Sequence, residues 1–75
     1  MSETVYTTTK MFSLIQGERV VSVDAGTGTV VIACQHGAGN WIDVKIYSAD
    51  TVEVLDFGLN RTYRFTITGD ATYAL

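Results

Sequence analysis

Apolar and polar residues alternate along most of this chain, and glycine-centred turns interrupt the alternation from end to end. A period of two is typical of strands with one buried face, and the chain has no sustained 3.6-residue helical period. The turn glycines recur at about the eight-to-twelve-residue spacing of small antiparallel β domains. The pattern predicts strands over residues 3–15, 19–24, 29–35, 41–47, 51–55, 61–68 and 71–75.

We therefore predict an all-β fold, a small antiparallel β-sandwich or flattened barrel of about seven short strands. The 75 residues are expected to form a single domain, 1–75. Residues 3–15 form either one long strand or two strands with a bend. Because residues 2–9 are polar and rich in threonine, they are also candidates for an extended N-terminal arm that contacts a neighbouring subunit.

The alternating positions predict which side chains face the core. A near-continuous apolar run at residues 29–35 predicts a central strand that is buried on both faces. Val21 and Val23 are the expected inward pair of residues 19–24. The sharpest alternation belongs to residues 41–47 and 61–68, and it predicts these core residues: Ile42, Val44, Ile46, Tyr63, Phe65 and Ile67.

Charge and cysteine content exclude several classes of function. The formal net charge is −3, and the five Lys and Arg residues are scattered, which argues against binding to nucleic acid or to an anionic membrane. The N-terminus lacks the pattern of a signal peptide, so we expect synthesis in the cytoplasm. A single cysteine, Cys34, permits no intrachain disulfide. Small domains without disulfide or metal often rely on a partner surface, which favours a homo-oligomer or a larger assembly.

Two local patterns were tested for chemistry. Cys34 and His36 stand two residues apart and would share a strand face, as a nucleophile and its base require. Cys34, however, ends the most apolar run, where a thiol acts as a small buried hydrophobe, and His36 opens an exposed turn. Residues 26–28 read Gly-Thr-Gly, but a strand follows them where a dinucleotide-binding loop needs a helix.

The carboxylates are candidates for glycoside hydrolysis or for calcium binding. Those considered are Asp43, Asp50, Glu53, Asp56 and Asp70. No calcium-loop pattern joins them, and three lie beside turns, where aspartate binds local backbone amides. We therefore predict no catalytic residue, no metal ligand and no cofactor, and we do not expect an enzyme.

Aromatic residues leave three interpretations open: core packing, a protein interface, or stacking on a sugar. Trp41 is the main candidate for the last two, because it directly follows a glycine-rich loop. Trp41 belongs to a predicted interface set, together with residues of the possible N-terminal arm and residues beside the turns. This set comprises Thr7, Thr8, Thr9, His36, Trp41, Phe57 and Leu59.

The stretch 26–75 resembles the small all-β accessory proteins of tailed-bacteriophage virions. The resembling features are the Gly-Thr-Gly turn, residues 37–41 (Gly-Ala-Gly-Asn-Trp), residues 61–65 (Arg-Thr-Tyr-Arg-Phe) and the final residues 69–75. The resemblance implies a non-enzymatic part of the virion, located on the capsid surface and often present as a trimer.

Two functions remain open on these grounds. The first is a capsid decoration (cement) protein that docks on a major capsid protein and reinforces the head. The alternative is a small glycan-binding or adhesin module of a tail or head fibre, which would use Trp41.

Overall fold

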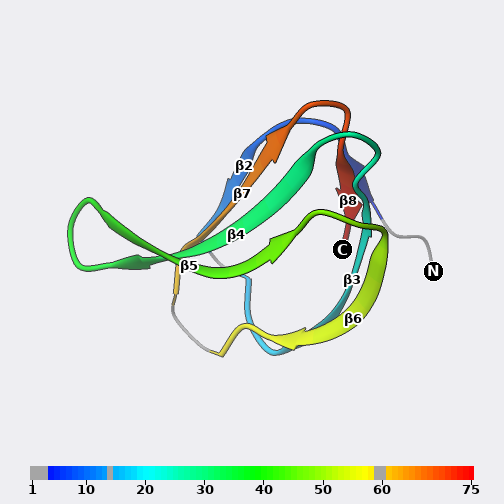
Figure 1. Cartoon of the computed structure of the whole chain (residues 1–75). Coiled ribbons are helices and arrows are strands. Elements are labelled where there is room, and N and C mark those ends of the chain that lie inside the picture. The colour runs from blue at the N-terminus through cyan, green and yellow to red at the C-terminus, as the bar shows by residue number, and fades with distance from the viewer. Residues whose placement is uncertain (1–3, 14, 59–60) are drawn as a thin grey trace.

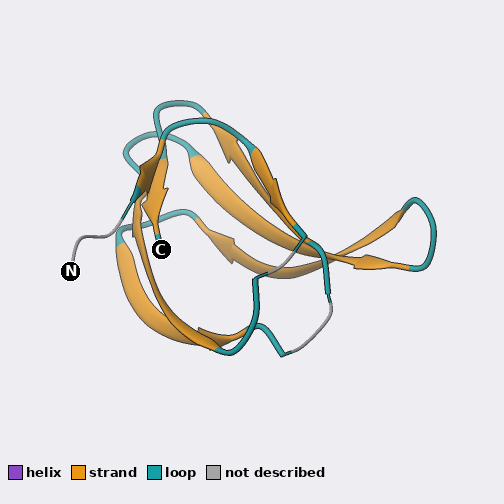
Figure 2. Ribbon diagram, turned by 180° about the vertical axis from the view of Figure 1, so that it is seen from behind, coloured by secondary structure: helices purple, strands orange, loops and turns teal. Residues whose placement is uncertain are grey.

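The computed structural model describes residues 4–13, 15–58 and 61–75. These residues form strands joined by turns, with no helix among them (Figures 1 and 2). In chain order the strands are β1 (Val5–Tyr6), β2 (Lys10–Phe12), β3 (Glu18–Asp24), β4 (Thr29–His36), β5 (Asn40–Tyr47), β6 (Thr51–Asp56), β7 (Tyr63–Thr68) and β8 (Thr72–Ala74).

The strands make two four-stranded sheets that pack face to face (Figure 1). Their orders are β1-β8-β3-β6, called sheet A below, and β2-β7-β4-β5, called sheet B. All strand pairs are antiparallel. The predicted all-β fold is confirmed, and the sandwich is the form it takes.

The described residues of the predicted region 3–15 form two strands with a bend, which is one of the two alternatives predicted. β1 joins sheet A by pairing with β8, and β2 joins sheet B by pairing with β7. The bend between them therefore carries the chain from one layer to the other. Tyr6 stacks on Tyr73 of β8 at 5.2 Å between ring centroids, so β1 contributes to this subunit's own packing.

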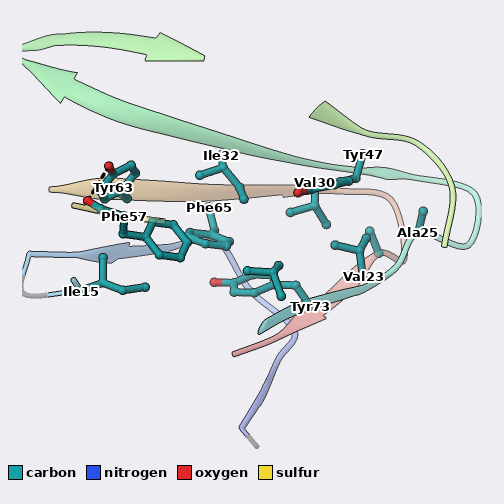
Figure 3. Packing of buried hydrophobic residues seen from close by; sticks show 12 residues of the cluster. Ile15, Val23, Ala25, Val30, Ile32, Tyr47, Phe57, Tyr63, Phe65 and Tyr73 are labelled. Atoms are coloured by element: carbon teal, nitrogen blue, oxygen red, sulfur yellow. Dashed lines mark hydrogen bonds between the residues drawn. The ribbon is translucent and has the colours of Figure 1, made fainter. Parts of the chain in front are cut away.

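The core lies between the sheets and is mostly aliphatic at one end and aromatic at the other (Figure 3). Val21 and Val23 of β3 point inward as predicted, and so do Tyr63 and Phe65 of β7. Val30 and Ile32 of β4 are fully buried, and Ala33 is nearly so, which fits the predicted central strand. Apolar burial of this kind is the main force that holds the two layers together.

The prediction for β5 is wrong. Ile42, Val44 and Ile46 are 55%, 50% and 64% exposed, respectively, and do not belong to the core. A β-bulge interrupts the β4–β5 register between Ile32 and Ala33, and Val44 is the extra residue. A bulge changes the alternation of faces along a strand, so one period-two assignment cannot hold across it.

The side chains of β5 that lie opposite buried residues of β4 are Lys45 and Tyr47, which alternate with Val44 and Ile46. Tyr47 lies opposite Val30, is buried, and its hydroxyl donates a hydrogen bond to the Glu53 carboxylate. Lys45 lies opposite the buried Ile32 and forms an ion pair with Glu53, with 3.2 Å between Nζ and Oε1. Because Glu53 serves both partners, β5 and β6 are linked across the layers by polar contacts.

The β4–β5 hairpin extends beyond the sandwich and forms a protruding arm, plainly visible in Figures 1 and 2. The protruding hairpin is connected to the rest of the sandwich by a hydrogen bond that the Gln35 amide donates to the Thr62 carbonyl oxygen at 2.8 Å. His36, the last residue of β4, is exposed and directly precedes the turn at residues 37–39. Side chains near this end have little protein around them, which explains why Ile42 stays exposed.

At the other end of the molecule, two turns pack against each other. The Asp70 carboxylate, beyond β7, accepts hydrogen bonds from the amide and the hydroxyl of Thr27, at 2.8 and 3.0 Å. A Cβ added to Gly28 would overlap the carbonyl oxygen of Thr68. The Gly-Thr-Gly turn is therefore a structural crossing point, in agreement with the rejection of a nucleotide loop.

Candidate docking surface

Eight large apolar side chains are exposed in the described part of the chain, each by at least 50%. They all lie within strands and not in turns. The residues are Val5, Met11, Val20, Ile42, Val44, Ile46, Val52 and Val54. Exposed apolar residues that gather on sheet faces are typical of sites for protein–protein contact.

On sheet A the exposed valines gather on β3 and β6. Val20 lies directly opposite Val54, and Ser22 lies opposite Val52. Residues that oppose each other in a sheet share a face, so these side chains form one continuous outer surface. On the other side of Ser22 the same row continues to Ala74 of β8 and then to Val5 of β1.

The ends of this outer surface are acidic. Glu18 and Asp24 alternate with Val20 and Ser22 on the same face of β3. Asp56, at the end of β6, lies opposite Glu18. Apolar residues therefore occupy the middle of the face and carboxylates its ends.

Sheet B presents a different surface with charges of both signs. Ile46 of β5 lies opposite Val31 of β4. Met11 of β2 lies opposite Arg64 of β7. The Arg64 guanidinium stands over the ring of Trp41, 4.5 Å from its centroid, in a cation–π contact. The basic group is thereby held on the outer face and not in the core.

The predicted interface residues do not form one surface. Thr7, Thr8 and Thr9 are exposed between β1 and β2, and the Thr9 hydroxyl accepts a hydrogen bond from the Ile67 amide at 3.0 Å. His36 is exposed at the end of β4, beside the turn of the protruding hairpin. The interface role of these residues stays a prediction.

Phe57 needs a correction, because it is only 2% exposed and cannot reach a partner. Its ring packs edge-on against Tyr63 at 4.9 Å, and its carbonyl oxygen accepts a hydrogen bond from the Tyr63 hydroxyl. The sequence placed it beside a glycine turn, and the chain at that turn folds the ring inward. Leu59, the other apolar residue of the turn, lies outside the described residues.

Cys34 and His36 give no sign of a nucleophile–base pair. Cys34 is a free thiol and half-buried, less enclosed than its apolar neighbours led us to expect. Its Sγ donates to the Gln35 carbonyl oxygen at 3.7 Å. This is a local backbone contact of the kind that a structural thiol makes.

The aspartates beside turns bind backbone amides, as predicted. Asp50 accepts from the Ala25 amide at 3.0 Å, and Asp56 from the Gly58 amide at 2.9 Å. The two hydrogen bonds from Thr27 hold the pKa of the Asp70 carboxyl below its usual range. Among the described residues, no three His, Cys, Asp or Glu side chains gather in a way that could hold a metal ion.

Glu53 is the carboxylate with the densest set of partners. The hydrogen bond from the Tyr47 hydroxyl, and then the contact with Lys45, lower the pKa of Glu53. Burial and the neighbouring carboxylate raise the pKa of the Tyr47 hydroxyl well above its usual value. The Glu53 carboxylate lies between β5 and β6 and binds Tyr47 and Lys45 of the same chain, so these contacts stabilise the sandwich.

The sequence did not single out Val20, Val52 or Val54 as surface residues. The alternation within residues 51–55 is the signal that could have found them: Val52 and Val54 lie on one face, and Glu53 and Leu55 lie on the other. Because each of the two faces holds an apolar residue, the alternation did not show which face points inward.

Comparison with protein-family models, curated proteins and solved structures found no significant match. In the described residues, no helix is long and apolar enough to cross a membrane.

Proposed function

We propose that this chain is a non-enzymatic interaction protein, a capsid decoration protein that docks on the outer surface of a virus head and reinforces it. The observation that carries the proposal is the set of eight apolar residues exposed on the strands. Such residues are costly to leave in water, at about 25 cal/mol per Å² of apolar surface. Docking through sheet A would cover four of them, Val5, Val20, Val52 and Val54, and would stabilise both the domain and its support.

The shape of the molecule favours a role in covering another surface. It measures 32 × 29 × 17 Å along its principal axes, so it is broad and thin. A broad face of such a body is comparable in area to the roughly 800 Å² that each partner contributes to a standard interface. The virion setting and the trimer come from the resemblance of residues 26–75 to phage accessory proteins, and both belong to the proposal.

The glycan-binding alternative has less support, because Trp41 is already engaged. The Arg64 guanidinium stacks on its ring, and a sugar would need an open ring face. The remaining aromatic side chains of the core are turned inward (Figure 3). We therefore retain the decoration protein as the single proposed function.

The test uses heads assembled with and without this chain. Heads that lack it are expected to rupture at a lower temperature, and adding the purified chain is expected to restore the higher rupture temperature. Sedimentation of the purified chain should give a homo-oligomer in solution or a monomer that binds heads. A chain that neither co-purifies with heads nor binds them on addition would contradict the proposal.

A further inference from the structure

We propose that the free edge of β6, with the outer face of β3 beside it, binds an extended, basic strand of a partner protein. The incoming strand would add to sheet A next to β6 and would carry Lys or Arg beside its apolar residues. The inference deepens the proposed function and rests on it, because it states which surface docks and what chemistry the shell presents there.

The first argument compares the four sheet edges of the described structure. An edge strand invites pairing unless it is short, bulged or carries a lysine. β1 has 2 residues and β2 has 3, including Lys10. β5 is bulged at Val44 and places Lys45 beside the bulge. Three of the edges thus carry recognised protection against strand addition.

The edge at β6 is neither short nor bulged and carries no lysine, and its inward-pointing charge, Glu53, is paired with Lys45. It has 6 residues, Thr51–Asp56, without lysine, glycine or proline. Its register with β3 runs unbroken from Asp56 opposite Glu18 to Thr51 opposite Val23. A regular strand of this length offers a row of backbone donors and acceptors to an incoming strand, as in β-augmentation.

The second argument concerns the side chains that the incoming strand would meet. Val52 and Val54 alternate on the outer face and are 71% and 59% exposed, respectively, and Val20 lies beside Val54 in β3. Cross-strand pairs between β-branched residues stabilise a sheet by up to about 1 kcal/mol each. The partner strand is therefore expected to present β-branched or other apolar residues on this face.

The third argument concerns charge, and it selects the partner. Glu18, Asp24 and Asp56 mark the ends of the apolar face. Arg19 alternates to the other face of β3, Lys45 is paired with Glu53, and among the described residues no basic side chain forms an ion pair with any of the three carboxylates. A partner with Lys or Arg at these positions would complement the acidic ends and would be guided toward them.

A second copy of the chain fits this edge poorly. Antiparallel self-pairing that places Val52 opposite Val54 would also place Glu53 opposite the Glu53 of the other copy. Like charges directly opposite each other destabilise a sheet. The chain as a whole is acidic, with a net charge of −3, so a basic partner is favoured over self-association at β6.

The direct test uses two short synthetic peptides and the full chain. In one peptide valines occupy the middle of one strand face, lysines occupy both ends of that same face, and threonines fill the other face; in the other peptide glutamate replaces lysine. The lysine peptide is expected to bind at least about tenfold more tightly, a difference that weakens with salt. Hydrogen exchange should show new protection of the β6 amides. Equal binding of the two peptides, or protection confined to β5, would overturn the inference.

Matched variants locate the site. Val52→Lys places a protective lysine on β6, and Ile46→Lys makes the same change at a comparably exposed position of β5, at 71% and 64% exposure. Val52→Lys is expected to weaken peptide binding about tenfold, and Ile46→Lys to leave it unchanged. Thermal unfolding confirms that both fold. Equal effects of the two variants would contradict a site at β6, and so would a dimer whose β6 protection grows with protein concentration.

The same variants separate this inference from the proposed function. If the unaltered chain binds heads and Val52→Lys binds them equally well, the docking surface is assigned wrongly while the decoration function stands. If the unaltered chain binds the lysine peptide at β6 but never binds heads, the decoration function fails and the strand-binding edge remains.

Discussion

At the scale of single residues, Phe65 holds the two layers together. Its ring is fully buried and packs on rings from both sheets, stacking on Tyr73 at 4.6 Å and meeting Phe12 edge-on at 5.4 Å. Figure 3 shows it in the middle of the cluster between Ile32 and Tyr73. A residue that joins so many contacts leaves a large cavity when it is truncated.

Phe65→Ala is therefore expected to lower the free energy of unfolding by about 3–5 kcal/mol, measured by chemical denaturation. Ile42→Ala is the control, because its side chain is 55% exposed and its loss should change stability by less than about 0.5 kcal/mol. Similar losses for the two variants would mean that β5 faces the core after all.

The residue scale also shows where sequence reasoning stops. Alternation separated the two faces of β3 and β7 correctly, because one face of each is clearly more apolar. In β5 the bulge at Val44 leaves Ile46 on the outer face opposite Val31, while Ile42, opposite Cys34, lies on the protruding hairpin and is 55% exposed. A period of two says which residues share a face but not which face is inside, and Tyr47 could pack inward because Glu53 satisfies its hydroxyl.

At the scale of elements, the crossing of two turns sets the spacing of β3, β4, β7 and β8. Gly28 follows β3 and touches the backbone at Thr68, so no side chain fits there. Gly69 is equally confined, since an added Cβ would lie 2.9 Å from the Cα of Gly28. The sequence predicted turns at both places but not their contact, which depends on how the layers stack.

Gly28→Ala is expected to cost about 2–3 kcal/mol, because backbone on both sides must move apart. Gly37→Ala, in the open hairpin turn, is the matched control. Its φ is +66° and an added Cβ meets nothing within 4 Å, so only the left-handed backbone is penalised, by about 1 kcal/mol. The ranking is checked by thermal unfolding of the two variants, and the reverse order would contradict the crossing.

At the scale of the whole molecule, charge links stability to pH. The carboxyls of Glu53 and Asp70 both have pKa values lowered by hydrogen bonds in the folded state. A lowered folded pKa gives stability that is fully present above the unfolded pKa, near 4, and is lost as pH falls through the folded value. The two groups join β5 to β6 and one turn to another, so acid weakens two separate contacts that hold the sandwich together.

Stability is accordingly expected to change little through these groups between about pH 6 and 8 and to fall below about pH 4. Asp70→Asn removes one of the titrating groups and should make the acid decline shallower. The measurement is the denaturation midpoint as a function of pH. An identical pH profile in the variant would show that the bonds to Thr27 do not contribute.

The whole-molecule scale is also where the docking surface arises. Single-strand patterns predicted the β-sandwich but could not show that Val20 would lie opposite Val54, because that contact depends on the pairing of strands distant in sequence. The same applies to the unprotected edge at β6, since the edge position of a strand is a property of the sheet order.

Thr4, the first residue that the structure describes, and Leu75 meet along one edge of sheet A. The Leu75 amide donates to the Thr4 carbonyl oxygen at 3.3 Å, and β1 and β6 are the opposite edges of that sheet. Three interstrand spacings of about 4.8 Å separate those edges, roughly 14 Å in all. A cargo protein fused at either Thr4 or Leu75 would therefore leave β6 uncovered, and two cargoes would stand side by side. Sheet A therefore offers fusion points on one edge, while the proposed docking strand lies on the other.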